Sequence, residues 1–192
     1  MSWAAAAMRK LTVTGCYTMA ALSKVLSGRE VSLSSAFSGV GTEGTASRII
    51  CNSAARFLGN HAIGGPMRFV HEYAIEAAQE CQLELMGPLG PNHIYTNIMD
   101  FNKPGSNKIR AALGLGQGSF RSAHCARCNK DCFARTCDIS VAGSPCTDHS
   151  TFGKQEGMAG KQCVPFGAWC RLKRRTLDKV ILHENVPSFG AH

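Results

Sequence analysis

The sequence predicts an α/β fold built on a mostly parallel sheet, and three observations support this. Short β-prone runs alternate with segments of helical periodicity, as they do in folds that place helices on both faces of a parallel sheet. Glycine-containing turns separate several of these segments. The chain has 192 residues, 44% of them hydrophobic, which suits one domain with a sizeable core.

The first predicted unit is a strand, a glycine turn and a helix. Residues 31–37 alternate mildly and are β-prone, and they run into the glycine turn at residues 38–41. Thr42 can cap a helix whose apolar residues continue at helical spacing as far as Leu58, and Gly59 is a C-terminal stop signal.

The same alternation of strand-like and helix-like segments predicts the remaining elements in order. Further strands are expected at residues 67–71, 93–99, 138–142 and 180–183, and further helices at residues 74–86 and 162–174. Residues 102–136 have no sustained period and are predicted to form a Cys-rich insertion. Residues 1–29 lack acidic side chains and are predicted to be an N-terminal extension that need not be ordered.

Composition narrows the classes of function and location. Lys and Arg number 21 against 13 Asp and Glu, so the net charge is +8, which suits a polyanionic partner. Ten cysteines are about 5% of the chain, below the roughly 8–10% of secreted disulfide scaffolds, which favours an intracellular protein with reduced thiols. No apolar run is long enough to span a membrane.

Several residues are expected at the carboxyl ends of strands, where parallel sheets bind ligands. The turn containing Phe37, Gly39 and Gly41 would let the backbone approach a nucleotide-like cofactor, although an ordinary tight turn is the alternative. Glu72, expected to end the second strand, would suit ribose hydroxyls, and Asp100, expected to end the third, would suit an adenine amino group. Solvated surface acids are the alternative for both.

A candidate nucleophile follows the fourth predicted strand. Cys146 lies in the turn Ser144-Pro145-Cys146, and partly exposed cysteines in such turns can act as thiolates. Glu184 ends the next strand, so Cys146 and Glu184 are expected to face one pocket. His149 could instead act as a base for Cys146, which leaves a thiol hydrolase as an alternative.

Taken in order, the segments FSGVG, Glu72, Asp100, SPC and ENV resemble the ordered motifs of the cytosine-C5 methyltransferase family, over roughly residues 31–190. The resemblance implies a Rossmann-like, S-adenosylmethionine-dependent methyltransferase fold, with residues 30–192 as a partial catalytic domain. The family's arginine motif, target-recognition domain and last motifs would lie beyond His192. The fold is therefore expected to be incomplete at its C-terminal end, and a C-terminal half or a partner chain would complete it.

The resemblance also implies roles for single residues. Phe37, Gly39 and Gly41 would line the S-adenosylmethionine pocket, with Glu72 on the ribose and Asp100 on the adenine. Cys146 would add to C6 of cytosine, and Glu184 would bind the cytosine edge. The implied activity is that of a DNA (cytosine-5-)-methyltransferase acting on DNA, with RNA as an alternative polymer, and located in the nucleus if the source is a eukaryote.

Two further features support a rival function. Cys125, Cys128, Cys132 and Cys137 could hold a structural zinc ion, or they could be free thiols in an irregular loop. A basic run could contact phosphates or form a solvated helix face; it comprises Arg171, Lys173, Arg174, Arg175 and Lys179 beside Trp169. The alternative function is an inactive methyltransferase-like remnant that binds nucleic acid through these two features.

Overall fold

The computed structural model describes residues 3–15, 18–61, 64–102, 122–150, 153 and 155–190. The chain divides into two compact units, and each is described by itself. The first unit comprises Met1–Ser32 and Thr42–Val70, and the second comprises Leu33–Gly41 and His71–His192. Among the described residues, no helix combines the length and apolar character that a membrane crossing needs.

The first unit is mainly helical. It contains α1 (Trp3–Val13), α2 (Met19–Leu26), α3 (Thr42–Leu58) and the short 3-10 helix η1 (Gly59–His61). The Thr18 hydroxyl accepts a hydrogen bond from the Ala21 N–H at 3.1 Å and so caps α2. Ala4 and Met8 of α1 are buried, and α1 packs against α3. The sequence allowed disorder in residues 1–29, whereas the structure places two helices there.

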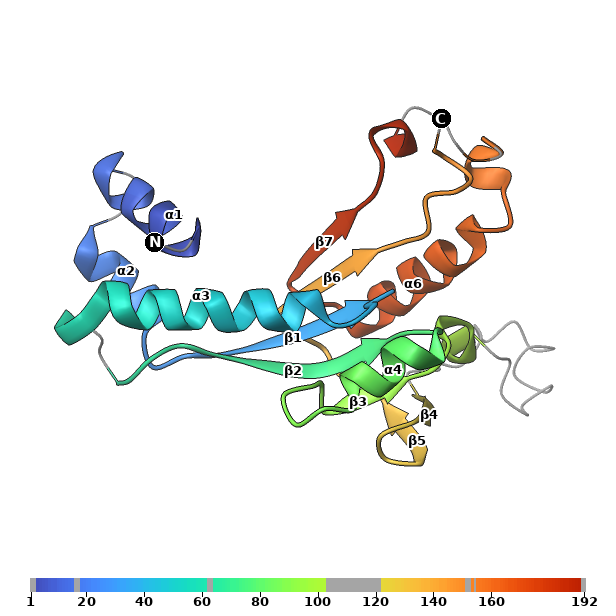
Figure 1. Cartoon of the computed structure of the whole chain (residues 1–192), viewed down its shortest axis with the longest axis horizontal. Helices are drawn as coiled ribbons and strands as arrows, with labels where there is room; N and C mark the ends of the chain where they lie inside the picture. The colour runs from blue at the N-terminus through green and yellow to red at the C-terminus, as the bar shows by residue number, and fades with distance from the viewer. Residues whose placement is uncertain are drawn as a thin grey trace. The chain divides into compact units, whose positions relative to one another are not determined.

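One seven-stranded sheet organises the fold (Figure 1), in the order β5-β4-β3-β2-β1-β6-β7. Its strands are β1 (Glu30–Ala36), β2 (Arg68–Ile75), β3 (His93–Tyr95), β4 (Ser122–Cys125), β5 (Lys130–Phe133), β6 (Ile139–Gly143) and β7 (Val180–Glu184). Strand β6 pairs in parallel with both β1 and β7, and β3 pairs in parallel with β2. Strands β4 and β5 add an antiparallel hairpin. The mostly parallel α/β sheet predicted from the sequence is confirmed.

The registers bring several strand ends to one edge of the sheet. Ala36, the last residue of β1, lies opposite Ala142 of β6, and Gly143 lies opposite Glu184 at the end of β7. The turns that follow β1, β6 and β7 therefore leave the sheet at a common edge, which is where parallel α/β sheets gather their functional loops.

The second unit also contains α4 (Gln79–Leu85), α6 (Cys163–Thr176) and the 3-10 helices η2 (Ile98–Asn102), η3 (Gly157–Ala159) and η4 (Pro187–Gly190). Its core joins the sheet to α6, from which Ala168, Trp169 and Leu172 are buried. Tyr73 and Tyr95 are both buried, with ring centroids 5.7 Å apart in an edge-on arrangement.

Three predicted elements differ from the structure. The helix expected at 74–86 begins only at Gln79, because Ala74 and Ile75 are buried and continue β2. The strand expected at 93–99 ends at Tyr95 and is followed by η2. The insertion expected at 102–136 forms the β4–β5 hairpin in its described part, and residues 103–121 lie outside the described residues.

Candidate functional site

The glycine turn after β1 has an unusual backbone. Phe37, Gly39 and Gly41 all have positive φ angles, of 57°, 50° and 77°. A Cβ on Gly41 would lie 2.7 Å from Leu85 Cδ2, whereas a Cβ on Gly39 would meet nothing within 4 Å. Glycine at position 41 therefore permits close packing on α4, while Gly39 leaves its backbone open on one side.

The acid at the end of β2 is Glu76, not Glu72. Because β2 continues to Ile75, Glu72 lies inside the strand and Glu76 directly follows it. The Glu76 carboxylate accepts hydrogen bonds from the Gly39 N–H at 2.7 Å and from the Ala78 N–H at 2.8 Å. The sequence reasoning missed Glu76 because it ended the strand too early; the apolar run Tyr73-Ala74-Ile75 was the signal that β2 continues.

Asp100 lies in η2 rather than at the end of a strand. Its backbone N–H donates to the carbonyl of Asn97 at 3.1 Å, and its side chain is partly exposed. Because η2 follows β3 after only two residues, Asp100 lies beyond the carboxyl end of that strand and does not end it, as the sequence had predicted it would.

Cys146 lies in the turn that leaves β6. Its side chain is partly exposed, and its carbonyl accepts from the N–H groups of His149 at 2.9 Å and Ser150 at 2.7 Å. Two tight hydrogen-bonded turns therefore follow the cysteine directly, and they hold its backbone in place.

The turns after β6 and β7 are bonded to each other. The Asn185 amide donates to Ser144 Oγ at 2.9 Å and to the Ser144 carbonyl at 3.3 Å, and its own Oδ1 accepts from the Val186 N–H at 2.8 Å. Glu184 is exposed, and a Cβ on Gly143 would lie only 3.4 Å from Glu184 Oε2. The glycine thus leaves room for the carboxyl group to lie beside the end of β6, three residues before Cys146.

Residues after Cys146 connect this turn to the start of α6. Asp148 is buried and accepts from the Gln162 N–H at 2.7 Å, and His149 Nε2 lies 3.1 Å from Cys163 Sγ. The His149 ring also packs on Phe189, with centroids 4.5 Å apart. This contact with Cys163 indicates a structural role for His149. It disfavours the hypothesis of a thiol hydrolase, in which His149 would act as a base for Cys146.

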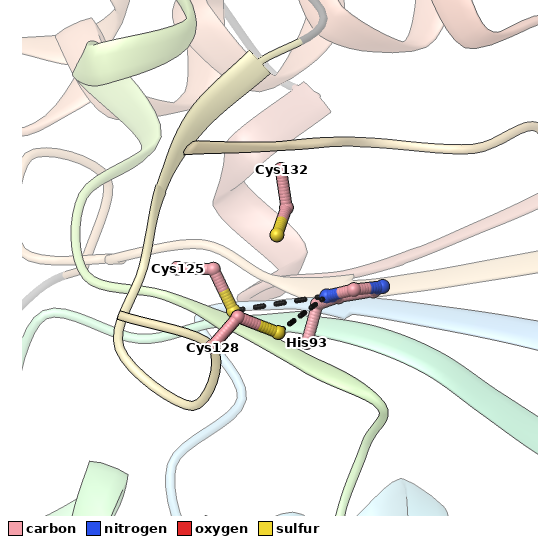
Figure 2. Close-up of side chains that lie close together, drawn as sticks. All are labelled: His93, Cys125, Cys128 and Cys132. Carbon is pink, nitrogen blue, oxygen red and sulfur yellow. Dashed lines mark hydrogen bonds between the residues drawn. The ribbon is translucent and has the colours of Figure 1, made fainter. Parts of the chain in front are cut away.

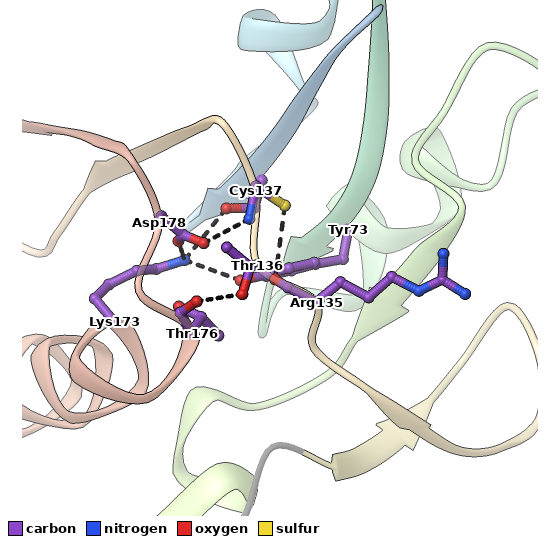
Figure 3. Close-up of polar contacts among 8 residues, drawn as sticks. Tyr73, Arg135, Thr136, Cys137, Lys173, Thr176 and Asp178 are labelled. Atoms are coloured by element: carbon purple, nitrogen blue, oxygen red, sulfur yellow. Dashed lines mark hydrogen bonds and ion pairs between the residues drawn. The ribbon is translucent and has the colours of Figure 1, made fainter.

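One residue of the predicted basic run, Lys173, lies in a network of polar contacts (Figure 3). Lys173 is buried and bonds to Asp178 at 2.7 Å, Tyr73 Oη at 2.9 Å and Ser34 Oγ at 3.2 Å. Burial lowers the pKa of the Lys173 ammonium, and the Asp178 carboxylate opposes that shift. Arg175 donates to the Phe101 carbonyl at 3.0 Å. Lys173 is therefore not presented to solvent as a phosphate contact, whereas Arg175 is partly exposed and Arg171, Arg174 and Lys179 are exposed.

The metal-ligand set differs from the predicted one. His93, Cys125, Cys128 and Cys132 bring their ligand atoms within 4.8 Å of one another (Figure 2). Cys137, which the sequence predicted as the fourth ligand, lies in the Lys173–Asp178 network, where its N–H donates to Asp178 Oδ1 at 2.7 Å. Burial raises the pKa of the Cys137 thiol to about 12, as expected for a neutral core thiol. His93 could not be found from cysteine spacing, because it belongs to a different strand.

Two hollows of about 450 and 400 Å³ lie in the first unit. Arg48, Cys51 and Met67 are among the residues that line the larger, and Arg9 and Arg56 are among those that line the smaller. Neither is lined by a residue that the sequence predicted for the site.

The sheet edge thus carries a glycine turn, a cysteine turn and a carboxylate on neighbouring parallel strands, an arrangement typical of Rossmann-like methyltransferases. Residues 122–192 match the family model described as C-5 cytosine-specific DNA methylase, so this segment of the chain is similar to that family. The family transfers methyl groups from S-adenosylmethionine to cytosine in DNA. A search of curated proteins found no match to the chain.

Proposed function

We propose that the chain is a DNA cytosine-C5 methyltransferase in which Cys146 attacks the base and Glu184 binds its edge. The observation that carries this proposal is the parallel register of β6 and β7, which sets Gly143 opposite Glu184. The hydrogen bonds from Asn185 to Ser144 tie the two turns together. Both Cys146 and Glu184 lie within the segment that matches the family model.

The proposed chemistry explains why a thiol and a carboxyl group are needed together. C5 of cytosine is a weak nucleophile until the Cys146 thiolate forms a bond to C6, which moves electron density onto C5. A hydrogen bond and proton from Glu184 at N3 would stabilise the charge that this addition creates. After C5 has taken the methyl group, loss of the C5 proton to a base restores the double bond and expels the thiolate.

The glycine turn and two acids are the proposed site for the methyl donor. S-adenosylmethionine supplies an electrophilic methyl group on a sulfonium, and the open backbone at Gly39 fits the approach of such a ligand. Phe37 and Gly41 would line the same side of the donor site, and the Asp100 carboxylate would accept a hydrogen bond from the adenine amino group. The proposed ribose ligand moves from Glu72 to Glu76, because Glu76 follows the end of β2 and bonds to the turn.

The proposed substrate is DNA, with the target base outside the helix. C6 of cytosine is not accessible to a side chain within a stacked duplex, so addition of Cys146 requires the base to be flipped out. DNA as substrate also suits the net charge of +8. We propose an intracellular location, in the nucleus if the source is a eukaryote.

Covalent trapping tests the proposal directly. A DNA oligonucleotide carrying 5-fluorocytosine should form a stable adduct with the chain in the presence of S-adenosylmethionine, because a C5 fluorine cannot leave as a proton does. Cys146→Ala should abolish the adduct, measured by denaturing electrophoresis and mass spectrometry. Cys81→Ser is the matched control, since Cys81 is a partly buried thiol on α4, and it should keep full trapping.

Glu184→Gln distinguishes the carboxyl's role from a general loss of structure. It should slow trapping by roughly 100-fold, within the range for removing one transition-state hydrogen-bond donor. Binding of S-adenosylmethionine, measured by calorimetry, should be unchanged. Adduct formation at the parent rate in Glu184→Gln, or trapping that survives Cys146→Ala, would contradict the proposal.

The second candidate function is nucleic-acid binding without catalysis, through a zinc module and the basic run. The metal-ligand cluster supports this second function, because it could hold the zinc ion of such a module. The burial of Lys173 argues against a contact between that residue of the basic run and nucleic acid. A binding module would form a salt-sensitive complex that Cys146→Ala leaves intact and that traps no fluorinated base. Parallel trapping on matched DNA and RNA oligonucleotides would separate the two polymers.

A further inference from the structure

We propose that His93, Cys125, Cys128 and Cys132 form a structural zinc site that fastens the β4–β5 hairpin to strand β3. The four ligand atoms lie within 4.8 Å of one another (Figure 2). One histidine nitrogen and three sulfurs are a donor set that zinc prefers. The proposal goes beyond methyl transfer and would hold whether or not the chain is an active enzyme.

The distances fit a tetrahedral metal centre. His93 Nδ1 lies 3.4 Å from Cys128 Sγ and 3.7 Å from Cys125 Sγ. A zinc ion with bonds of about 2.3 Å to sulfur and about 2.0 Å to nitrogen, at tetrahedral angles, separates a sulfur ligand from a nitrogen ligand by about 3.5 Å. The two separations that involve His93 are therefore close to those that a bound ion would impose.

The ligands come from three strands and one turn. His93 begins β3, Cys125 ends β4, Cys128 lies in the hairpin turn and Cys132 lies on β5. Among the described residues, β3 pairs with β4 through Tyr95 and Cys125, and the Ala126 N–H donates to the Ile94 carbonyl at 2.7 Å, which is a short contact for a sheet extension. A metal ion bound to all four ligands would add a strong connection at this point.

The surroundings of the cluster suit thiolate ligands. The Ile94 N–H donates to Cys125 Sγ at 3.4 Å, and the backbone N–H groups of Arg127 and Cys128 also bond to this sulfur. Such donors commonly support metal-bound sulfur. Three thiolates and one Zn²⁺ leave a net charge of −1. Lys130 and Arg135 lie close enough to act electrostatically on His93, and so does Glu72 with the opposite sign.

The site is closed and therefore structural. Four protein ligands complete the coordination of zinc and leave no open position for a reacting molecule. Cys125 and Cys132 are buried, and Cys128 and His93 are partly buried, so the ion would be shielded on most sides. Binding would release one proton from each of the three thiols, while His93 would bind as the neutral imidazole through Nδ1.

The test uses the whole chain, stripped of metal under reducing conditions and titrated with Co²⁺ and then with Zn²⁺. The parent should bind about one equivalent, and Co²⁺ should give the thiolate charge-transfer and intense tetrahedral d–d absorption bands. His93→Ala should reduce Co²⁺ affinity at least 10-fold, within the range seen when a ligand shell is disturbed. His93→Cys should restore binding and shift the charge-transfer bands as the fourth ligand becomes a thiolate.

Two matched variants separate this ligand set from the one the sequence suggested. His124→Ala alters an exposed histidine next to Cys125, and Cys137→Ser alters the buried cysteine in the Lys173–Asp178 network. Both should keep one equivalent with parent-like absorption bands. The proposal is overturned if the parent binds no metal, if His93→Ala binds as tightly as the parent, or if Cys137→Ser loses the bands while His93→Ala keeps them.

Discussion

Phe37 has a backbone conformation that is costly for a residue with a side chain. Its φ angle of 57° lies in the left-handed region, where residues other than glycine are uncommon. The surrounding structure holds it there: the Phe37 N–H donates to the Ile75 carbonyl at 2.8 Å, and its side chain packs partly against the core. Such strain is concentrated at functional turns, which agrees with the proposed role of this segment in binding the methyl donor.

Exchanging Glu72, inside β2, and Glu76, directly after it, one at a time tests which acid binds the methyl donor. Glu76→Gln should weaken S-adenosylmethionine binding by about tenfold or more, since a hydrogen bond from a ribose hydroxyl to a charged group contributes about 1.5–3 kcal/mol. Glu72→Gln, a variant inside the same strand, should leave the affinity within about twofold. Isothermal titration calorimetry measures both. Weaker binding in Glu72→Gln alone would return the ribose role to the residue that the sequence first suggested.

Asn185 is a positioning residue for the proposed nucleophile. Asn185→Ala removes its hydrogen bonds to Ser144 and leaves the contact of 2.8 Å between Ser144 Oγ and His183 Nε2 of β7, so the turn that carries Cys146 should be held less firmly to the end of β7. We expect the rate of covalent trapping to fall at least tenfold, because small displacements of reacting groups cost one to two orders of magnitude. S-adenosylmethionine affinity should not change.

Two further variants control this prediction. Ser188→Ala removes the hydrogen bond from its hydroxyl to the His149 carbonyl, in the same segment, and should leave trapping nearly unchanged. In Ser144→Ala, a second substitution of Asn185 should cost less than in the parent, because the two residues share one interaction. Additive effects of the two substitutions would show that Asn185 does not act through Ser144.

At the scale of the element, α6 is fixed at both ends by buried polar contacts. Asp148 receives the Gln162 N–H at the start of the helix, and near its end Lys173 pairs with Asp178. The Lys173 ammonium also lies 5.2 Å from the centre of the Tyr73 ring (Figure 3). Helix α6 therefore holds together the turn that carries Cys146 and the middle of the sheet.

Removing one partner of this buried pair should be strongly destabilising. Asp178→Ala leaves the Lys173 charge buried without its counter-ion and removes the acceptor of the Cys137 N–H. We expect a loss of about 3–5 kcal/mol in the free energy of unfolding, measured by urea denaturation. The double variant Lys173→Met, Asp178→Leu should recover much of that loss. A single-variant loss below about 1 kcal/mol would mean that water reaches the ammonium group.

Strand β7 forms the sheet edge on the side of the proposed catalytic residues. Val180, Ile181 and Leu182 remain about half exposed, which is unusual for three consecutive apolar residues. Because Glu184 ends this strand, anything that pairs with β7 would also affect the position of that carboxyl group.

For the whole molecule, local patterns predicted the fold well. Alternation of strands and helices gave the α/β class, and α3 runs from Thr42 to Leu58 as its cap and stop residues indicated. Errors arose where tertiary burial overrides the local pattern. The sequence pattern predicted that a helix starts at residues 74–75. In the structure these residues belong to a central strand, which suits their apolar side chains because both faces of the strand are covered.

The site was predictable only in so far as it follows strand ends. The turns with Cys146 and Glu184 follow directly from the positions of β6 and β7, so their approach could be inferred from the sequence. The metal-ligand cluster was not predictable in full, since His93 and Cys125 are brought together by pairing between distant segments. Cysteine spacing alone pointed to Cys137, which the fold places elsewhere.

The free energy of unfolding of the whole molecule should depend on pH, and one histidine, His71, should contribute measurably to that dependence. Burial lowers the pKa of His71 to about 4, although a backbone hydrogen bond at Tyr73 opposes the shift, and Nε2 lies 3.0 Å from Ser35 Oγ. In the unfolded chain the pKa of histidine is about 6.5, so the unfolded state binds a proton that the folded state excludes between these values. This contribution is fully present above pH 6.5 and is lost as the pH falls towards 4.

The free energy of unfolding should accordingly fall by an amount on the order of 3 kcal/mol from His71 alone as the pH is lowered through this window. His71→Gln keeps a polar group that can reach Ser35 but does not titrate, and it should make the dependence on pH shallower by that amount. Urea denaturation of both chains at closely spaced pH values, with metal content held constant, measures the difference. Identical pH profiles for the parent and His71→Gln would show that protonated His71 is accommodated in the folded state, which the packing of β2 beside β1 argues against.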